Sequence, residues 1–384
     1  MSEEYSNKKI TITINDQCVD VNEGITILEA ARQHNIYIPT LCDFEGLTPF
    51  GGCRTCVVEI EEFNGLMTAC TTPVSDGTHI YTDSEKVKKI RKSVLEMILS
   101  EHPTNCLFCA ESGDCLDHMQ TVRKGQATTG CRSCPQDGQC ELQDVIEYVG
   151  LTGISLPTTY RNLEIEKYDP FYDRDYNLCI LCGRCIRVCQ EMRLADVLAF
   201  KQRGHVTRIG PSFERTHLEA DCEFCGACLT VCPTGTLSEK TRKWDGKPEK
   251  TVTTTCPFCS IGCQIDLLVK NGEVIGSLPA NNGQLCVKGR FSVYELLNNS
   301  HRLNFAYRYE QGFRTRISQD EAIDRAADLL AACSPEKFGL MISANCTNED
   351  LYIAQKFVRK AMNSHHIDSS IRQFYGTGLD AYIE

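Results

Sequence analysis

Alternating apolar and polar residues mark the first patterned segment of the chain. Isoleucines alternate with threonines over residues 8–14, which predicts a strand with one buried face. Asn15 and Asp16 form a turn signal, and residues 18–21 are predicted to return as a second strand. Residues 25–32 then carry apolar side chains at helical spacing. The N-terminal pattern therefore predicts two strands and a short helix.

A longer amphipathic helix is predicted over residues 84–100. Val87, Ile90, Val94 and Ile98 recur at helical spacing and would share one face. The basic residues between them are expected on the opposite, solvated face. Such a helix would rest on a core and fix where the chain continues after it.

Two hairpins are predicted in the middle of the chain. Residues 197–200 and 205–209 have strand-like composition on either side of a glycine turn. Residues 264–278 form a second hairpin pattern with Asn271 and Gly272 at its turn, a dipeptide that favours a tight two-residue turn.

The C-terminal pattern indicates an α/β type. A helix is predicted to end at Ala332, a buried strand follows over residues 338–343, and another helix begins at residues 347–350. This alternation is typical of a Rossmann-like unit. The fold class predicted for the whole chain is therefore α+β and multidomain.

Charge and hydropathy narrow the class of protein. The chain has 384 residues and a formal net charge of −11. Nucleic acid is not a favoured partner, because phosphate contacts require a basic face. An acidic surface suits docking to a basic protein partner, although it is also common among soluble proteins. No segment reaches the roughly 18 apolar residues of a membrane span and no secretory signal is visible, which predicts a cytoplasmic protein.

The 25 cysteines change the picture most. Thiols stay reduced in the cytoplasm, so repeated C-x2-C spacing favours metal over disulfides. Three cysteines fall outside the spaced motifs: Cys18, Cys333 and Cys346. Of these, Cys18 and Cys333 lie in apolar or strand-like contexts and are expected to be small buried residues.

Two runs of the form C-x2-C-x2-C-x3-C predict a pair of [4Fe–4S] clusters. In ferredoxins with this spacing, the fourth cysteine of each run ligates the other run's cluster. A zinc site has no use for four thiols in eleven residues. The ligands predicted for one cluster are Cys179, Cys182, Cys185 and Cys232. The ligands predicted for the other are Cys222, Cys225, Cys228 and Cys189.

Four cysteines lie closer to the N-terminus in the pattern C-x10-C-x2-C-x13-C: Cys42, Cys53, Cys56 and Cys70. Glycines before the second and a proline after the last mark tight loops. The spacing alone is compatible with a zinc site or a [2Fe–2S] cluster.

A histidine-led triad with the spacing H-x3-C-x2-C-x5-C follows the long helix: His102, Cys106, Cys109 and Cys115. An imidazole can replace a thiolate at iron–sulfur iron, so ligation by His102 is predicted. Because imidazole is neutral, such a cluster should have a higher potential than one with four thiolates.

The triad is repeated with a constant offset of 25 positions, which indicates an internal duplication: Cys131, Cys134 and Cys140. Ala127 stands at the position equivalent to His102 and cannot ligate. Either each copy holds a cluster or one is a relic, and three retained thiols favour an extra cluster. Its fourth ligand is open between His118, a remote cysteine, a carboxylate and none, the last giving a [3Fe–4S] cluster.

A final group has the pattern C-x2-C-x3-C-x22-C: Cys256, Cys259, Cys263 and Cys286. It is followed by Val-Lys-Gly-Arg, which contains Lys288. Taken alone, the spacing is also compatible with a zinc ribbon.

In combination, these motifs resemble the iron–sulfur region shared by the complex I large peripheral subunit, NAD-linked formate dehydrogenase α subunits and [FeFe]-hydrogenases. The resemblance implies a β-grasp [2Fe–2S] ferredoxin over residues 1–82. It implies a one-histidine, three-cysteine [4Fe–4S] module over residues 83–160, repeat included, and a two-cluster ferredoxin over residues 161–245. Residues 250–300 resemble the [4Fe–4S] domain that opens molybdopterin oxidoreductases, and residues 301–384 resemble a truncated α/β domain.

The resemblance also implies the cofactors: one [2Fe–2S] cluster and four or five [4Fe–4S] clusters. In the molybdopterin family, the lysine at the position of Lys288 lies between cluster and pterin, so Lys288 is a candidate cofactor-binding residue. The catalytic metal ligand of that family commonly follows an arginine by two residues. Here Phe374 takes that position after Arg372, so no molybdopterin is predicted.

The implied role is electron transfer within an NAD(P)H-linked oxidoreductase complex, with no independent catalytic site. The implied partners are an NAD(P)H-oxidising FMN flavoprotein subunit, a small [2Fe–2S] subunit and ferredoxin. The combination also suggests the electron-bifurcating transhydrogenases and hydrogenases of anaerobes. The alternatives are the N-terminal part of a catalytic Mo/W formate dehydrogenase α subunit, and a cluster-based redox sensor or scaffold. No G-x-G-x-x-G or P-loop motif supports a nucleotide site.

Overall fold

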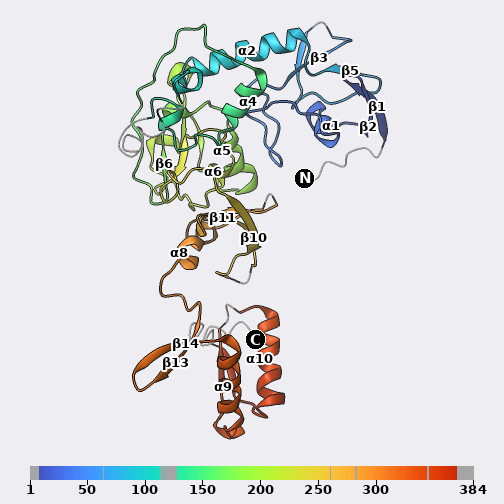
Figure 1. Ribbon diagram of the computed structural model, residues 1–384. Coiled ribbons are helices and arrows are strands. Elements are labelled where there is room, and N and C mark those ends of the chain that lie inside the picture. Colours follow the sequence, from blue (N-terminus) through green and yellow to red (C-terminus); the bar gives the residue numbers. More distant parts are fainter. Residues whose placement is uncertain are drawn as a thin grey trace. The chain divides into compact units, whose positions relative to one another are not determined.

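The computed structural model describes residues 8–63, 65–112, 115, 128–259, 261–281, 283–343 and 346–369 (Figure 1). The chain divides into two compact units, each considered by itself. The first comprises Met1–Val252 with Asp266–Phe291, and the second comprises Thr253–Ile265 with Ser292–Glu384. Among the described residues, no helix is long and apolar enough to cross a membrane.

The first unit begins with a five-stranded sheet in the order β2-β1-β5-β3-β4. Its strands are β1 (Lys9–Ile14), β2 (Gln17–Asn22), β3 (Val57–Ile60), β4 (Leu66–Thr68) and β5 (His79–Tyr81). Strands β1 and β5 run parallel, while β1–β2, β3–β4 and β3–β5 are antiparallel. Ile10, Ile12 and Ile14 are buried in its core. The predicted N-terminal strand pair is confirmed.

Helix α1 (Ile27–Gln33) follows the strand pair, as predicted, but begins two residues later than the pattern suggested. The hydroxyl of Thr26 accepts a hydrogen bond from the Glu29 backbone, and the Glu29 carboxylate accepts one from the Thr26 backbone. This capping box satisfies backbone donors that the first turn leaves unpaired, and so fixes where the helix starts.

Helix α2 (Glu85–Leu99) forms where the pattern predicted, but its buried face is different. Leu95 and Leu99 are buried together with Val87, whereas Ile90 is 41% exposed. Arg91 was expected on the solvated face and is only 1% exposed. Its guanidinium donates to the carbonyls of Thr55 (3.0 Å) and Val57 (2.8 Å), which explains how a cation replaces an apolar residue there.

Short elements surround the remaining cysteines of the first unit. They are η1 (Asn105–Phe108), η3 (Cys131–Ser133), α4 (Glu141–Val149), β6 (Tyr172–Arg174), η4 (Tyr176–Leu178), α5 (Arg184–Arg187), η5 (Val188–Met192), β7 (Ala199–Lys201), η6 (Gly204–Val206), β8 (Arg208–Gly210), η7 (Ser212–Glu214), α6 (Ala227–Thr230) and β9 (Leu237–Glu239). Strand β6 pairs with β9, and β7 pairs with β8 in the predicted hairpin.

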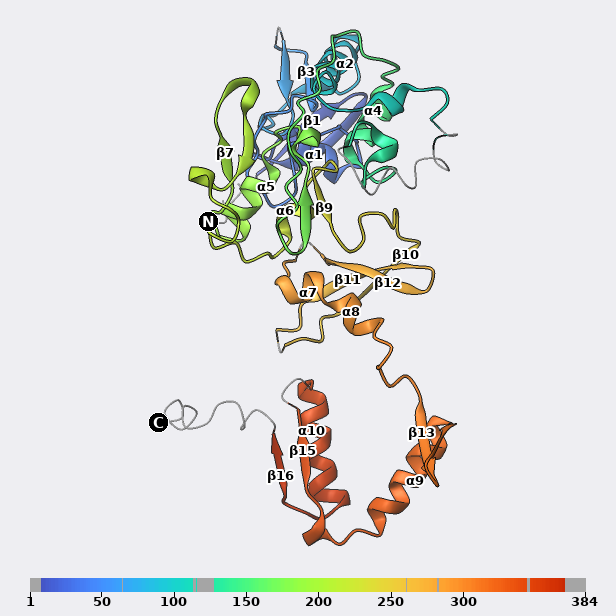
Figure 2. The same cartoon turned by 90° about the vertical axis from the view of Figure 1, so that its left-hand side faces the viewer.

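The unit ends with most of β11 (Gln264–Lys270), β12 (Glu273–Pro279) and helix α7 (Val287–Phe291), which packs on β12 (Figure 2). Strand β10 (Lys250–Thr255) begins in this unit and joins β11. The predicted hairpin is confirmed. Its turn residues Asn271 and Gly272 have φ of 51° and 79°, as a tight turn requires.

The second unit contains α8 (Val293–Leu297), β13 (Ala306–Glu310), β14 (Phe313–Ile317), α9 (Gln319–Ala331), η8 (Pro335–Lys337), β15 (Leu340–Ile342), α10 (Asn348–Lys356), η9 (Phe357–Ala361) and β16 (Ile367–Ser369). The predicted helices are α9 and α10, and β15 pairs with β16 in parallel. The prediction of a buried strand was wrong, because Met341 is 68% exposed and β16 is the only strand paired with β15 among the described residues. Arg372 and Phe374 lie outside the described residues.

The expectation that two free cysteines are buried was also wrong. Cys18 is exposed, because it lies on the solvent face of β2, opposite the buried Val19 and Val21. Cys333 is half-buried, just after the end of α9.

Candidate metal centres

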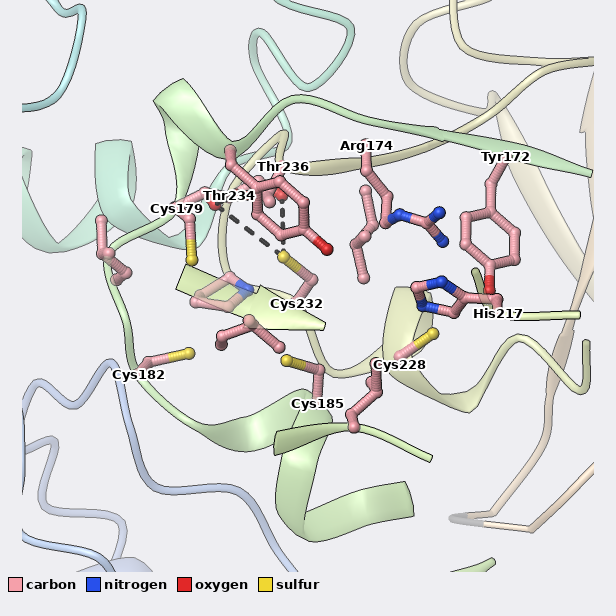
Figure 3. Close-up of a pocket in the computed structure, with 16 residues that line it drawn as sticks. Tyr172, Arg174, Cys179, Cys182, Cys185, His217, Cys228, Cys232, Thr234 and Thr236 are labelled. Atoms are coloured by element: carbon pink, nitrogen blue, oxygen red, sulfur yellow. Dashed lines mark hydrogen bonds between the residues drawn. The ribbon is translucent and has the colours of Figure 1, made fainter. Parts of the chain in front are cut away.

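Four thiols that the spacing assigned to one cluster line a single cavity: those of Cys179, Cys182, Cys185 and Cys232 (Figure 3). Cys228 of the second run and apolar side chains such as Leu198 and Ile209 complete much of the wall. Burial raises the pKa of Cys179 to about 11 and that of Cys182 to about 12. Such thiols carry negative charge only if a cation such as iron compensates it.

The two cysteine runs have the same backbone turns. Leu181 and Phe224, at equivalent positions, have φ of 54° and 50°, and the glycines that follow, Gly183 and Gly226, have φ of 71° and 75°. Helices α5 and α6 begin directly after these glycines. The turn directs the Phe224 N–H at the sulfur of Cys222, 3.4 Å away. Hydrogen bonds of this kind favour a thiolate, which suits a cluster ligand.

The exchanged cysteine of the second predicted cluster also lies with its partners. Burial is the main cause that raises the pKa of Cys228, and the nearby thiols of Cys225, Cys222 and Cys189 raise it further. Cys189 comes from the first run, so the fold brings thiols of both runs together, and the crossed ligand assignment stays a prediction.

The N-terminal group of four thiols is compact. The Cys53 N–H donates to the sulfur of Cys42 at 3.5 Å, and the sulfurs of Cys56 and Cys70 are 3.5 Å apart. Hydrogen bonds from the thiols of Cys53 and Cys70 hold the pKa of Cys42 well below its usual range. The loop before Cys53 contains Gly51, whose φ of 64° suits a residue without a side chain. These four thiols are therefore close enough together to ligate one small metal centre.

The two triads differ in their surroundings. Cys131, Cys134 and Cys140 line one cavity, and His102 lies in its wall. Cys131 and Cys140 are buried, whereas Cys109 of the first triad is exposed and Cys106 and Cys115 are half-buried. Burial lowers the pKa of His102 to about 4, with a smaller contribution from Arg161. The position of His118 lies outside the described residues.

The last cysteine group is divided between the two units. In the second unit, the Cys256 N–H donates to the Cys263 carbonyl at 2.8 Å, Cys256 is buried and Cys259 is exposed. Cys286 and Lys288 belong to the first unit, where both are exposed. Their joint role remains a prediction.

No three histidine, cysteine or acidic side chains among the described residues gather closely enough to hold a single metal ion. The thiols of Cys179, Cys182, Cys185 and Cys232 surround one cavity and those of Cys131, Cys134 and Cys140 surround another, which is the arrangement that a multi-atom cluster needs. We therefore interpret these groups as cluster sites.

Two arginines inside the first cysteine run were not singled out by the spacing. Arg187 donates to the backbone carbonyls of Cys42 and, at 2.5 Å, of Thr48. Arg184 pairs with Glu141 at 2.8 Å, directly after Cys140. The sequence shows that these two basic residues lie between predicted cysteine ligands. It does not show their partners, which lie more than 40 positions away in the chain.

Four protein-family models match separate parts of the chain. They are a 2Fe-2S iron-sulfur cluster binding domain (residues 7–85), the NADH-ubiquinone oxidoreductase-G iron-sulfur binding region (91–120), a 4Fe-4S dicluster domain (178–236) and the molybdopterin oxidoreductase Fe4S4 domain (249–299). The oxidoreductase-G match ends before Cys131, so it includes the first triad and not the second.

Curated relatives match almost the whole chain. NADPH-Fe(3+) oxidoreductase subunit alpha of Geobacter sulfurreducens is 34% identical over 94% of this chain and 40% of its own length. An NADH-quinone oxidoreductase subunit of Rhizobium meliloti is 31% identical with the same coverages. NADP-reducing hydrogenase subunit HndD of Solidesulfovibrio fructosivorans is 35% identical over 71% of this chain and 44% of its own. The chain thus spans about 40% of the length of the first two relatives.

A solved structure is also similar: the crystal structure of an NAD+-reducing [NiFe]-hydrogenase in the H2-reduced state. It matches with a TM-score of 0.50 and 27% identity over 60% of this chain and 87% of the hydrogenase chain. This chain therefore contains domains of these four iron–sulfur families, and it is similar to proteins named as NADH-quinone oxidoreductase, NADP-reducing hydrogenase and putative formate dehydrogenase proteins.

Proposed function

We propose that this chain is the iron–sulfur electron-transfer subunit of an NAD(P)H-linked oxidoreductase complex. It would hold one [2Fe–2S] cluster and four or five [4Fe–4S] clusters on the cysteines assigned above. The relatives named as NADPH-, NADH- and NADP-linked oxidoreductase or hydrogenase subunits support this class. The clusters would supply one-electron redox chemistry, and the chain would hold, shield and tune them.

The observation that carries the proposal is that short contacts join neighbouring candidate sites of the first unit. The sulfur of Cys140 lies 3.5 Å from the carbonyl of Pro233, the residue next to Cys232. Leu178 lines the cavity of the second triad and directly precedes Cys179. The second triad and the first ferredoxin site are therefore connected twice: by the contact between Cys140 and Pro233, and by Leu178, which is bonded to Cys179.

The N-terminal thiol group is connected to the ferredoxin runs in the same way. Arg187 lies between Cys185 and Cys189 and donates to the carbonyl of Cys42. The Thr48 N–H also donates to the carboxylate of Glu191, at 2.7 Å. The loop that begins at Cys42 is thus hydrogen-bonded to the segment that carries Cys189. Sites joined by such short connections are suited to electron transfer inside the protein.

The finer features of the proposal follow from the family resemblance. We infer that the N-terminal sheet is a β-grasp ferredoxin (1–82), followed by the triad module (83–160), the two-cluster ferredoxin (161–245), the molybdopterin-type cluster domain (250–300) and an α/β piece (301–384). Electrons would enter from an FMN flavoprotein with a small [2Fe–2S] subunit. Ferredoxin is the proposed second partner, in a complex of the electron-bifurcating type.

The test is to purify the native complex without oxygen, identify its subunits and measure metals. We expect about 22 iron atoms per chain with all sites filled, or about 18 with only one triad occupied. We also expect a flavoprotein partner and cluster reduction by NADH or NADPH. Stoichiometric molybdenum or tungsten would instead support the formate dehydrogenase alternative. Clusters that NAD(P)H does not reduce in the presence of the flavoprotein would support a sensor or scaffold.

A further inference from the structure

We propose that His102 is the fourth ligand of a [4Fe–4S] cluster held by Cys131, Cys134 and Cys140, and not of a cluster held by the triad that directly follows it in sequence. This inference rests on the proposed function only in requiring that the chain binds clusters. It assigns a ligand set that neither the spacing nor the matched family region indicates.

The first support is the cavity itself. Its wall includes His102 and the three cysteines of the second triad, together with neighbours such as Leu178. Thr104 and Leu107, from the segment that follows His102, also line it. The first triad's described cysteines do not: Cys106, Cys109 and Cys115. The histidine therefore faces the second set of thiols, which begins 29 positions further along the chain.

The second support is an unpaired nitrogen on the imidazole ring. The Nδ1 atom of His102 is shielded from solvent and has no hydrogen-bond partner. The ring interacts with the backbone of Leu178, which lies in the same cavity wall. A metal-ligating histidine commonly has one nitrogen oriented by the backbone and the other free for the metal. A buried nitrogen without a partner otherwise costs stability, so it calls for an occupant such as iron.

The third support is the pair of helices that positions these ligands. Helix α2 ends at Leu99, three residues before His102, and helix α4 begins immediately after Cys140. Leu95 and Leu99 of α2 pack in one core with Leu142 of α4. The end of one helix and the start of the other are therefore held together by apolar packing. His102 and Cys140 can thus lie in one cavity wall although the repeat lies between them in the sequence.

The first triad is left as a separate group of three thiols. The sulfur of Cys106 lies against Gly130, where an added Cβ would be only 2.5 Å from it, so the two triads adjoin. Cys109 is exposed, unlike any cysteine of the second triad. A [3Fe–4S] cluster, or a [4Fe–4S] cluster with a non-protein ligand, would fit the three thiols of this first triad. The duplication thus places the additional site nearer to solvent and keeps the histidine with the buried one.

The test uses the full-length chain, assembled without oxygen and labelled with 15N-histidine. The reduced clusters are examined by pulsed electron–nuclear spectroscopy in wild type and in two matched variants, Cys134→Ala and Cys109→Ala. We expect a directly bound histidine nitrogen in wild type, its loss in Cys134→Ala and its retention in Cys109→Ala. His102→Cys should also remove the nitrogen coupling while keeping the cluster, and should lower its midpoint potential because a thiolate adds negative charge.

The opposite pattern, with the coupling lost in Cys109→Ala and kept in Cys134→Ala, would overturn the assignment. A wild-type protein with full iron content and no histidine coupling would also overturn it. Either result would leave the electron-transfer proposal standing, whereas a native complex without iron would end that proposal too. The signals of the [2Fe–2S] cluster and of the ferredoxin clusters show in each variant that the rest of the chain is folded.

Discussion

This chain contains two duplicated cysteine regions, the ferredoxin runs and the triads, and their predicted cluster ligands are grouped differently. In the ferredoxin runs, the spacing predicts that each copy supplies three ligands to its own cluster and exchanges the fourth, and the thiols of Cys179, Cys182, Cys185 and Cys232 line one cavity. In the triads, the two copies share a single histidine, and the fold places it beside the distant copy. The difference is that a ferredoxin run contains its own turns, at Gly183 and Gly226, whereas His102 is positioned by a helix that precedes the repeat.

Removing one ligand from each triad should separate the two copies most strongly. Cys134→Ser should lose about four iron atoms per chain and slow electron transfer from NAD(P)H by more than about tenfold, since even outer partners of metal sites are worth roughly 10–100-fold. Cys109→Ser, the matched change in the exposed triad, should keep most of that rate. Iron analysis and steady-state turnover of the whole complex measure both. Equal losses in the two variants would show that the copies are equivalent.

A glycine beside the second triad provides the next test. A Cβ at Gly235 would lie 2.5 Å from the sulfur of Cys134 and 3.3 Å from the side chain of Leu178, so Gly235→Ala should displace one ligand. The expected result is loss of the histidine-ligated cluster signal with the [2Fe–2S] signal unchanged. Gly153→Ala is the control, because nothing lies within 4 Å of its added Cβ. An unaltered spectrum in Gly235→Ala would contradict the geometry of this site.

The buried arginine of α2 should matter for stability more than for chemistry. Arg91→Ala removes the donors to the carbonyls of Thr55 and Val57 and should cost about 2–4 kcal/mol of unfolding free energy. The expected measurement is a lower midpoint in thermal or urea unfolding of the assembled protein. Lys92→Ala, at the exposed neighbouring position, should be nearly neutral. If both changes cost the same, the helix does not depend on these bonds.

The smallest effect is expected at the exposed start of the same helix. The Lys86 ammonium, 2.5 Å from the Glu59 carboxylate, is the main cause that holds the pKa of that carboxyl below its usual value. Stability from this pair should be present at neutral pH and lost as the pH falls through the lowered pKa. Lys86→Gln should therefore be slightly less stable than Lys89→Gln at neutral pH, and the difference should disappear in acid. A difference that grows in acid would exclude this pair as its cause.

Much of the fold follows from local pattern, as the isoleucines of β1 and the Asn271–Gly272 turn show. Periodicity did not predict the buried face of α2 correctly. Arg91 is buried there because its guanidinium donates to backbone carbonyls at and before the start of β3, which are distant in sequence. Periodicity also failed at β15, where strand composition did not imply burial.

In the candidate sites, too, some features follow from local sequence pattern and others depend on contacts between distant residues. Spacing grouped Cys179, Cys182, Cys185 and Cys232, and the structure places these four thiols around one cavity. Spacing could not indicate which triad faces His102, because that depends on how Leu95 and Leu99 pack against Leu142, contacts between residues more than 40 positions apart. Nor could it show that Pro233 would link two sites through the sulfur of Cys140.

The most direct test of the relay is rapid-freeze spectroscopy of the native complex after mixing with NADH or NADPH. We expect several distinct cluster signals of this chain to appear within the turnover time, and we expect Cys134→Ser to interrupt the later ones while the [2Fe–2S] cluster is still reduced. If the clusters stay oxidised during turnover, or if all of them are reduced at the wild-type rate in Cys134→Ser, the chain is not a relay through the second triad.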